Sequence, residues 1–247
     1  MTIDPDRVTA VVLAGGLGTR IKHLVPDLPK PMVPVRGRPF LEWVVGYLRH
    51  EGIRRVLIST GHLGEVIEKH FAVLPACGVE LRCIREREAL GTAGGFLHAV
   101  GSSGEQPDAW LVLNGDSLAF ADLAAVTAKL DEPQVRGVVV GVSMTDTSRY
   151  GRIAFDETGR LLQFEEKQPG TGVINAGIYA FKPALLSHFP SKRPLSFEQD
   201  VFPQLLAQGT QLQVSVTSAP FLDIGTPESL LRAEEFVQQN LQLLQSA

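Results

Sequence analysis

The segment VTAVVLAGGLGTR, residues 8–20, decides which fold the sequence predicts. Residues 8–14 are a short apolar run with the length and composition of a buried strand. Gly15, Gly16 and Gly18 follow at once, and glycines there let the backbone approach a ligand and turn its amides toward phosphate oxygens. A tight strand-to-helix turn is the alternative interpretation of these glycines taken alone. The segment therefore predicts an α/β protein with a ligand near a strand end.

Short apolar runs alternate with helical patterns along the first half of the chain. Strands are predicted at residues 8–14, 54–60, 80–85 and 110–114, and helices at residues 40–48, 64–71 and 94–100. Because a helix separates each strand from the next, the strands are expected to run parallel. The first half thus predicts a Rossmann-like, doubly wound, mostly parallel sheet.

After residue 130 the apolar runs come closer together. Strands are predicted at residues 135–143, 152–155, 161–166 and 173–181, and the run DETG at 156–159 suits a hairpin loop between the middle two. Thr226 and Pro227 supply an N-cap and a first-turn proline for a last helix that runs toward Leu244. We expect an antiparallel extension of the parallel sheet, within one compact domain that covers residues 1–247.

The balance of charge excludes some classes of partner. The 247 residues contain 23 Lys and Arg against 27 Asp and Glu, a net charge of −4, with no basic run. Nucleic acids and anionic membranes bind clustered cations, so neither is expected as a partner. No apolar stretch approaches the roughly 20 residues of a membrane span. Cys77 and Cys83 lack a CxxC arrangement, which argues against a disulfide scaffold or a zinc site and indicates a reducing cytoplasm.

Two common phosphate-binding motifs are absent. The GxxxxGK[ST] loop of P-loop proteins does not occur, and Ile21 stands where the dinucleotide fingerprint needs a third Gly or Ala. Four prolines between residues 26 and 34 make the segment after Arg20 an extended loop instead of a helix. The glycine turn therefore belongs neither to a kinase nor to a Rossmann dehydrogenase.

Six motifs occur along the chain in the order of one family. The first is a signature made of GGLGTR at 15–20 together with PKPMVPV at 29–35, and the other five are LGTAGG at 90–95, LNGD at 113–116, EEK at 165–167, NAGIY at 175–179 and DIGTP at 223–227. Together they resemble the sugar-1-phosphate nucleotidyltransferases over nearly the whole chain. The resemblance implies a glycosyltransferase-A-like fold with a nucleotide-binding part at residues 1–130. Residues 131–247 would bind the sugar phosphate and end in the C-terminal helix.

In this family an oxygen of a sugar 1-phosphate attacks the α-phosphorus of a nucleoside triphosphate, and pyrophosphate leaves. Negative charge grows on the leaving oxygens, so cations and a metal should dominate catalysis. The attacking phosphate has a second pKa of about 6 and is already ionised at pH 7, so no general base is needed. The absence of histidine from all six motifs agrees with this chemistry.

The resemblance assigns catalysis to Arg20, Lys30 and Asp116. Arg20 would hold the β- and γ-phosphates, and Lys30 would meet the α-phosphate in the transition state. The implied nucleotide-binding residues are Leu13, Gly15, Gly16, Gly18, Thr19, Arg20, Lys30, Glu86, Gly91, Thr92, Asn114 and Asp116.

Two acids follow apolar runs at predicted strand ends. Asp116 comes just after WLVLN, and Asp223 follows Phe221 and Leu222. Hard carboxylate oxygens completed by triphosphate oxygens and water suit Mg²⁺, which is the expected cofactor. The alternative is that Asp116 belongs to a turn and that Asp223 caps the turn at Gly225.

Gly151, Glu166, Lys167, Asn175 and Gly177 are the residues that the resemblance places beside the sugar phosphate. Lys167 would bind the phosphate group, and Glu166 would bind sugar hydroxyls. Outside the resemblance, the EEK run is an ordinary solvated charge cluster and Gly177 marks a strand bulge.

Glu86, five residues before Gly91, matches the position that reads the base in this family. A carboxylate can accept two parallel hydrogen bonds from the N1–H and N2–H₂ edge of guanine, whereas uracil and thymine offer one donor between two carbonyls. Glu86 therefore favours GTP. Two alternatives stay open, because some similar uridylyltransferases also carry a carboxylate there, and because the charge could simply be solvated among its charged neighbours.

Stretches outside the shared motifs narrow the choice of sugar substrate. DLPKPM at 27–32, RPFLEW at 38–43, DTSRYGRIAFDETGRLLQF at 146–164 and SFEQDVFPQL at 196–205 most resemble D-glycero-α-D-manno-heptose 1-phosphate guanylyltransferases. Mannose-1-phosphate guanylyltransferases come next. A hexose or muramate phosphate uridylyltransferase and a non-catalytic nucleotide-sugar-binding regulator remain as alternatives. A homo-oligomer is also left open, with the last helix as a candidate interface.

Overall fold

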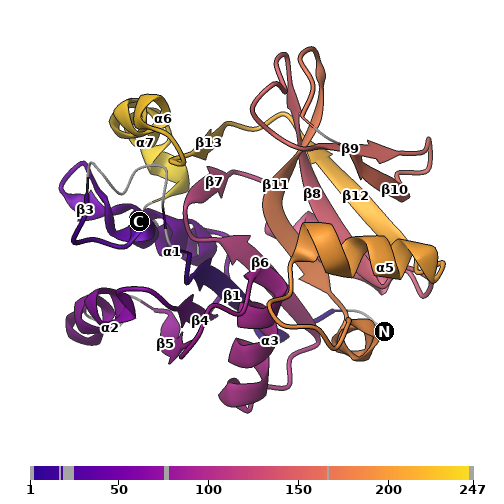
Figure 1. Ribbon diagram of the computed structural model, residues 1–247, viewed down its shortest axis with the longest axis horizontal. Coiled ribbons are helices and arrows are strands. Elements are labelled where there is room, and N and C mark those ends of the chain that lie inside the picture. The colour runs from indigo at the N-terminus through magenta and orange to yellow at the C-terminus, as the bar shows by residue number, and fades with distance from the viewer. Residues whose placement is uncertain (1–2, 17, 19–24, 75–77, 166, 245–247) are drawn as a thin grey trace.

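The computed structural model describes residues 3–16, 18, 25–74, 78–165 and 167–244. Four parallel strands lie side by side in the order β6 (Ala109–Asn114), β1 (Val8–Ala14), β4 (Arg55–Thr60) and β5 (Glu80–Arg85) (Figure 1). Their order differs from their order in the chain, and helices connect them. The predicted doubly wound parallel sheet is confirmed.

The remaining strands of the large sheet form the antiparallel extension. They are β8 (Gly137–Met144), β9 (Arg152–Phe155), β10 (Leu161–Glu165), β11 (Gly172–Phe181) and β12 (Leu212–Thr217). β11 pairs antiparallel with β6, β8 and β9, whereas β12 runs parallel to β8. Because β11 pairs with β6, both parts of the chain share one nine-stranded sheet.

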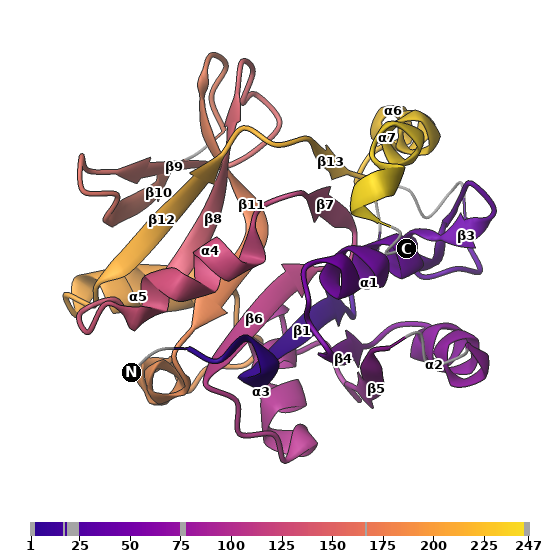
Figure 2. The ribbon, with the colours of Figure 1, turned by 180° about the vertical axis from the view of Figure 1, so that it is seen from behind.

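Helices cover both faces of this sheet. α3 (Thr92–Ser103) and α5 (Phe202–Ala207) lie on the face toward the viewer in Figure 1, and α1 (Phe40–His50) and α4 (Leu123–Ala128) lie on the face toward the viewer in Figure 2. Within β1, Val12 packs in the core with α1 and the adjacent Val11 packs with α3. Successive strand side chains point to opposite faces, so a strand covered on both faces is apolar throughout.

Short elements complete the fold. β7 (Ser117–Ala119) pairs antiparallel with β13 (Phe221–Asp223), and β2 (Pro34–Val35) pairs with β3 (Arg38–Pro39). The other helical elements before residue 220 are η1 (Pro5–Arg7), η2 (Lys30–Met32), α2 (Gly64–Val73), η3 (Lys129–Asp131), η4 (Pro183–His188) and the π-helical turn η5 (Phe197–Val201). Among the described residues, no helix combines the length and the apolar character needed to cross a lipid bilayer.

The C-terminal helix begins where predicted but is not continuous. Thr226 caps its start, and the chain then forms α6 (Pro227–Leu231), α7 (Ala233–Gln239) and η6 (Leu241–Leu243). The N–H of Arg232 donates to the carbonyl of Ser229, three residues back, at 3.2 Å, which breaks the regular helical ladder. Asn240 donates its side-chain amide to the carbonyl of Phe236 at 2.8 Å and so competes with the backbone where α7 ends.

Candidate active site

A cavity of about 380 Å³ lies at the carboxyl ends of the parallel strands, where open α/β sheets bind ligands. Ala14 at the end of β1 and Asn114 at the end of β6 contribute to its wall. Every described residue that the sequence predicts to bind nucleotide lines this cavity: Leu13, Gly15, Gly16, Gly18, Lys30, Glu86, Gly91, Thr92, Asn114 and Asp116. Thr19 and Arg20 lie outside the described residues.

The cavity wall also contains residues that the site prediction did not include. These are Ala14, Pro31, Ala89, Leu90 and Gly225. Pro31, Leu90 and Gly225 belong to the sequence motifs, so the motif positions were a signal for them, and Ala14 directly precedes the first motif. Gly225 shows that the DIGTP segment, near the end of the chain, reaches the same cavity as the first glycine turn.

The small β7–β13 sheet brings Asp116 and Asp223 together. Asp223 is paired with Ser117, the residue that follows Asp116. The N–H of Ile224 donates to the backbone carbonyl of Asp116 at 3.0 Å. The two predicted metal-binding acids, which are far apart in the sequence, therefore lie close together: Asp116 lines the cavity in the turn just before β7, and Asp223 is at the end of β13 beside it.

Lys30 lies between these two acids. Its Nζ is 2.6 Å from Oδ2 of Asp116 and 4.0 Å from Oδ2 of Asp223, and its side chain is only 11% exposed. Gly18 has a φ of +57°, and a Cβ built on it would lie 3.0 Å from Cβ of Lys30. A side chain at residue 18 would therefore be strained by the positive φ and would crowd Lys30, and glycine avoids both.

The acid pair has the donor chemistry that Mg²⁺ prefers. Both carboxylates converge on one cationic nitrogen, and their side chains are partly open to solvent, with 32% of Asp116 and 25% of Asp223 exposed. The described residues contain no cluster of three or more His, Cys, Asp or Glu that could hold a metal. A magnesium ion here would therefore take its other ligands from a triphosphate and water, which is its usual behaviour.

Glu86 holds its carboxylate against the glycine turn. Its Oε1 accepts a hydrogen bond from the hydroxyl of the buried Ser59 at 2.8 Å, and its Oε2 accepts one from the N–H of Leu90 at 3.3 Å. A Cβ built on Gly15 would lie 2.8 Å from Oε1 of Glu86. The carboxylate therefore belongs to the cavity wall and is not a freely solvated charge at a strand end.

Three predicted sugar-phosphate residues cluster beside Asn114. The N–H of Asn175 donates to the carbonyl of Gly151 at 3.3 Å, and the N–H of Gly177 donates to Oδ1 of Asn175 at 3.0 Å. Gly177 has a φ of +70°, and a Cβ built on it would collide with the side chain of Asn114. At this glycine, strand β11 thus brings the predicted sugar-phosphate residues against Asn114, a predicted nucleotide-binding residue.

The other two predicted sugar-phosphate residues follow β10. Lys167 is exposed, and Glu166 lies outside the described residues. Glu165, the last residue of β10, is in register with Arg152 of β9, which is in turn in register with Ile174 of β11. The end of β10 therefore lies on the same line across the sheet as Ile174, the residue before Asn175.

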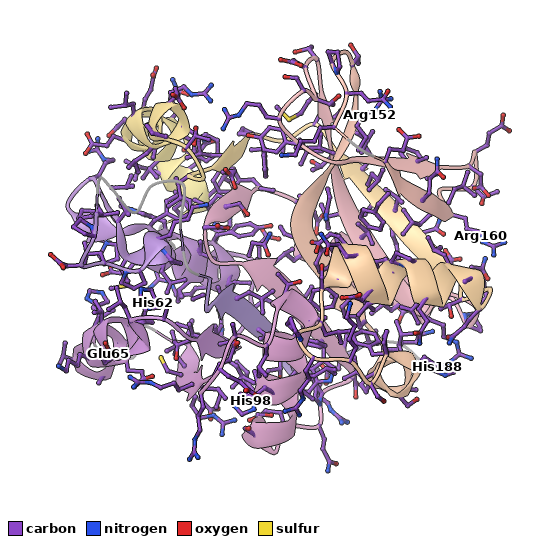
Figure 3. The ribbon with its side chains drawn as sticks, in the orientation of Figure 1. His62, Glu65, His98, Arg152, Arg160 and His188 are labelled. Atoms are coloured by element: carbon purple, nitrogen blue, oxygen red, sulfur yellow. The ribbon has the colours of Figure 1, made fainter. Side chains whose placement is uncertain are left out.

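The described histidines do not gather at the cavity. Figure 3 shows His62, His98 and His188 on three separate parts of the molecule. None of the described residues that line the cavity is a histidine. This distribution agrees with a reaction whose nucleophile is already ionised.

Polar side chains that were not among the predicted site residues form hydrogen bonds to those residues. Besides Ser59, the hydroxyl of Tyr179 donates to Oε1 of Glu198 at 2.8 Å and accepts from Nδ2 of Asn175 at 2.8 Å. Complete burial, with the charge of Glu198 nearby, holds the pKa of Tyr179 well above its ordinary value. Ser59 gave no sequence signal because it lies within the buried strand β4, whereas Tyr179 and Glu198 stand inside the quoted NAGIY and SFEQD stretches.

The profile of the nucleotidyl transferase family matches residues 9–240. The chain belongs to this family. A D-glycero-alpha-D-manno-heptose 1-phosphate guanylyltransferase of Campylobacter jejuni is 34% identical over 220 residues, which cover 89% of this nucleotidyl transferase and 95% of the relative. A mannose-1-phosphate guanylyltransferase of Mycobacterium tuberculosis is 35% identical over 229 residues, or 92% of this chain. The chain spans only 63% of the length of that second relative.

A solved structure shows the same fold. The crystal structure of HddC from Yersinia pseudotuberculosis complexed with GMP-PN superposes on this nucleotidyl transferase with a TM-score of 0.81 and 32% identity. The match covers 92% of this chain and 98% of HddC. Together with the family match, it confirms the predicted fold class and the predicted enzyme class.

Proposed function

We propose that this nucleotidyl transferase transfers GMP from GTP to a sugar 1-phosphate, D-glycero-α-D-manno-heptose 1-phosphate in particular, and releases pyrophosphate. The observation that carries the proposal is that one cavity is lined by the glycine turn, by Glu86, and by Lys30 and Asp116 with Asp223 beside them. These features match, in turn, a phosphate chain, a guanine edge and a metal-bound leaving group.

In the proposed reaction, an oxygen of the sugar phosphate forms a bond to the α-phosphorus of GTP. The bond from that phosphorus to the bridging oxygen breaks, and pyrophosphate leaves with its electron pair. A sugar phosphate has a second pKa of about 6, so the attacking oxygen carries no proton at pH 7. No side chain has to act as a base, and the residues around the cavity serve to position and to neutralise charge.

Lys30 is the cation best placed to stabilise the transition state. It lies next to both acids at the cavity and is largely shielded from solvent. We assign it to the α-phosphate, where charge grows during the reaction, and we assign Arg20 to the β- and γ-phosphates. A Mg²⁺ ion held by Asp116 and Asp223 would neutralise charge on the triphosphate oxygens.

Glu86 supports guanine as the base. Each of its carboxylate oxygens has a second lone pair beyond the bonds to Ser59 and Leu90, and these can accept from the paired donors of guanine. Uracil would place two carbonyl groups against the same carboxylate. The relatives described above as guanylyltransferases agree with this preference.

We favour heptose 1-phosphate over mannose 1-phosphate because a larger share of the heptose-specific relative aligns with this chain. The C. jejuni relative aligns over 95% of its own length, whereas the mycobacterial relative has a further third that this chain does not match. Mannose 1-phosphate is the second candidate, because the identity to the mycobacterial protein is equally high at 35%.

The proposal is tested with a matrix of the four nucleoside triphosphates against glucose, mannose, N-acetylmuramic acid and D-glycero-α-D-manno-heptose 1-phosphates. Pyrophosphate release with Mg²⁺ is the measurement. We expect the highest kcat/KM for GTP with the heptose phosphate. Equal or better use of UTP would reject the guanine assignment, and no release from any pair would reject the enzyme itself.

A further inference from the structure

A hydrogen-bonded chain connects the sugar-phosphate half of the site to η5, an element outside the cavity. Oδ1 of Asn175 accepts from the N–H of Gly177 at 3.0 Å, and Nδ2 of Asn175 donates to the hydroxyl of Tyr179 at 2.8 Å. That hydroxyl donates to Oε1 of Glu198 at 2.8 Å. Tyr179 is fully buried among Phe181, Phe197 and Phe202, so its hydroxyl is a polar atom in an aromatic cluster.

The directions of these hydrogen bonds follow from the number of hydrogens available. An ionised carboxylate only accepts, and a tyrosine hydroxyl has one hydrogen. Tyr179 must therefore give its hydrogen to Glu198 and accept from its other neighbour. That neighbour can only be the NH₂ group of Asn175, since the amide oxygen has no hydrogen to donate. The charge of Glu198 and the N–H of Gly177 therefore select the same orientation of the Asn175 amide from its two ends, and the charge strengthens the whole chain.

Glu198 is itself held firmly. Its second oxygen, Oε2, accepts from the hydroxyl of Ser196 at 3.0 Å. The adjacent residue, Phe197, donates its N–H to Oγ1 of Thr92 at 3.0 Å, and Thr92 lines the nucleotide cavity. The π-helical turn η5 thus contacts the nucleotide side through one residue and the sugar side through the next. Such turns are often found at functional sites.

We propose that Glu198 is a positioning residue for the sugar substrate, acting through Tyr179 to fix the direction of the Asn175 amide. Each group of that amide keeps one unused site, a lone pair on Oδ1 and a hydrogen on Nδ2. Because the direction of the amide is fixed, the acceptor Oδ1 and the donor Nδ2 each keep one position. A sugar phosphate therefore finds one acceptor and one donor in a defined arrangement for its neighbouring hydroxyls. This inference rests on the proposed function and adds to it a residue that does not touch the substrate.

The test compares Glu198→Gln, Asn175→Ala and the double variant with Gln199→Ala as the matched control, because the side chain of Gln199 on the same turn is exposed. Glutamine has nearly the shape of glutamate but can donate to Tyr179, so only the N–H of Gly177 still favours the native direction of the Asn175 amide, which is held less firmly. We expect Glu198→Gln to raise KM for the sugar phosphate about tenfold, as for a lost charge-assisted hydrogen bond. The Kd of GTP, measured without sugar, should stay within about twofold in all variants, and Gln199→Ala should match the wild type.

The double variant separates positioning from a general structural effect. If Glu198 acts through Asn175, adding Glu198→Gln to Asn175→Ala changes KM for the sugar phosphate no further. Full additivity, an unchanged KM in Glu198→Gln, or an equal loss of GTP affinity would overturn the inference. A wild-type enzyme that turns over no sugar phosphate would reject the proposed function instead.

A measurement that does not need turnover completes the test. In ¹⁵N-labelled protein, the side-chain amide signal that Asn175→Ala removes should shift or double in Glu198→Gln and stay in place in Gln199→Ala. An unshifted signal in Glu198→Gln contradicts the inference whatever the substrate. Thermal unfolding of each variant shows whether the protein remains folded. Tyr179→Phe, which removes the connecting hydroxyl and retains the ring, should reproduce the effect of Glu198→Gln.

Discussion

The ammonium group of Lys30 lies 2.6 Å from Oδ2 of Asp116, and Asp223 approaches the same nitrogen to 4.0 Å. Lys30 therefore occupies the space between the two carboxylates that we assign to the metal. A triphosphate would attract this lysine and leave the carboxylates open to a divalent cation. Nucleotide and metal are thus expected to bind together rather than separately.

Replacing Lys30 by methionine separates its two roles. Turnover should fall by at least about 100-fold, because a preorganised charge at the reacting phosphate is lost, while the Kd of GTP changes much less. Without its counterion, the acid pair should bind Mn²⁺ more tightly in the absence of nucleotide, as measured by electron paramagnetic resonance titration. The exposed Lys69 provides the control, and Lys69→Gln should change neither quantity. Weaker Mn²⁺ binding by Lys30→Met would contradict the arrangement.

Asp116→Asn should abolish most activity without unfolding the protein. The hydrogen bond from Ile224, the residue just after β13, uses the backbone carbonyl of Asp116, which the substitution preserves. We expect turnover to fall by at least about 100-fold, since an amide is a poorer magnesium ligand than a carboxylate. Initial rates across a Mg²⁺ titration and a thermal melt provide the measurement. The exposed Glu157 is the control site, and near-normal turnover in Asp116→Asn would remove this residue from the metal site.

Glu86→Gln should weaken the preference for guanine. An amide offers one donor and one acceptor, so it no longer matches the two donors of guanine and suits uracil better. We expect the ratio of kcat/KM for GTP to that for UTP to fall by about 10-fold or more. Ser59→Ala, which removes the bond that orients Oε1, should lower the same ratio by less. A ratio unchanged in both variants would show that the base is read elsewhere.

Gly177→Ala tests the contact between the two halves of the site. The added Cβ would suffer from a positive φ and would also collide with Asn114. Gly209 has a φ of +73° with nothing within 4 Å of its Cβ position, so Gly209→Ala measures the strain alone, about 1–2 kcal/mol. We expect a larger loss of stability in Gly177→Ala on urea unfolding, together with weaker GTP binding. Equal losses in the two variants would mean that Asn114 moves aside freely.

Stability should decrease at alkaline pH. Burial, together with the charge of Glu51, raises the pKa of Tyr47, so the folded protein keeps the phenol proton that the unfolded chain loses above about pH 10. The stabilisation from this group is therefore complete below that pH and is lost as the pH rises above it. Urea unfolding between pH 8 and pH 11 should show a steeper decline for the wild type than for Tyr47→Phe. Parallel curves would argue against this cause.

Local patterns in the sequence were sufficient to predict the strands of the central sheet. The strands β1, β5 and β9 begin and end where their apolar runs predicted, because an apolar run bounded by turn residues specifies a strand locally. The order of the motifs was sufficient to identify the protein family. The same local signals did not predict the break in the last helix, since it depends on how Arg232 and Asn240 satisfy nearby carbonyls.

The tertiary structure alone decided how the functional groups meet. Asp116 and Asp223 come together through two strands of three residues each, which are too short to show a periodic pattern in the sequence. The contact of Glu198 with Tyr179 and that of Ser59 with Glu86 likewise join separate elements. Sequence patterns report which face of an element is apolar, but which polar side chains touch depends on the packing of the whole sheet. For that reason the sequence by itself determined the fold and the kind of chemistry, and the packing determined the network that holds the site in place.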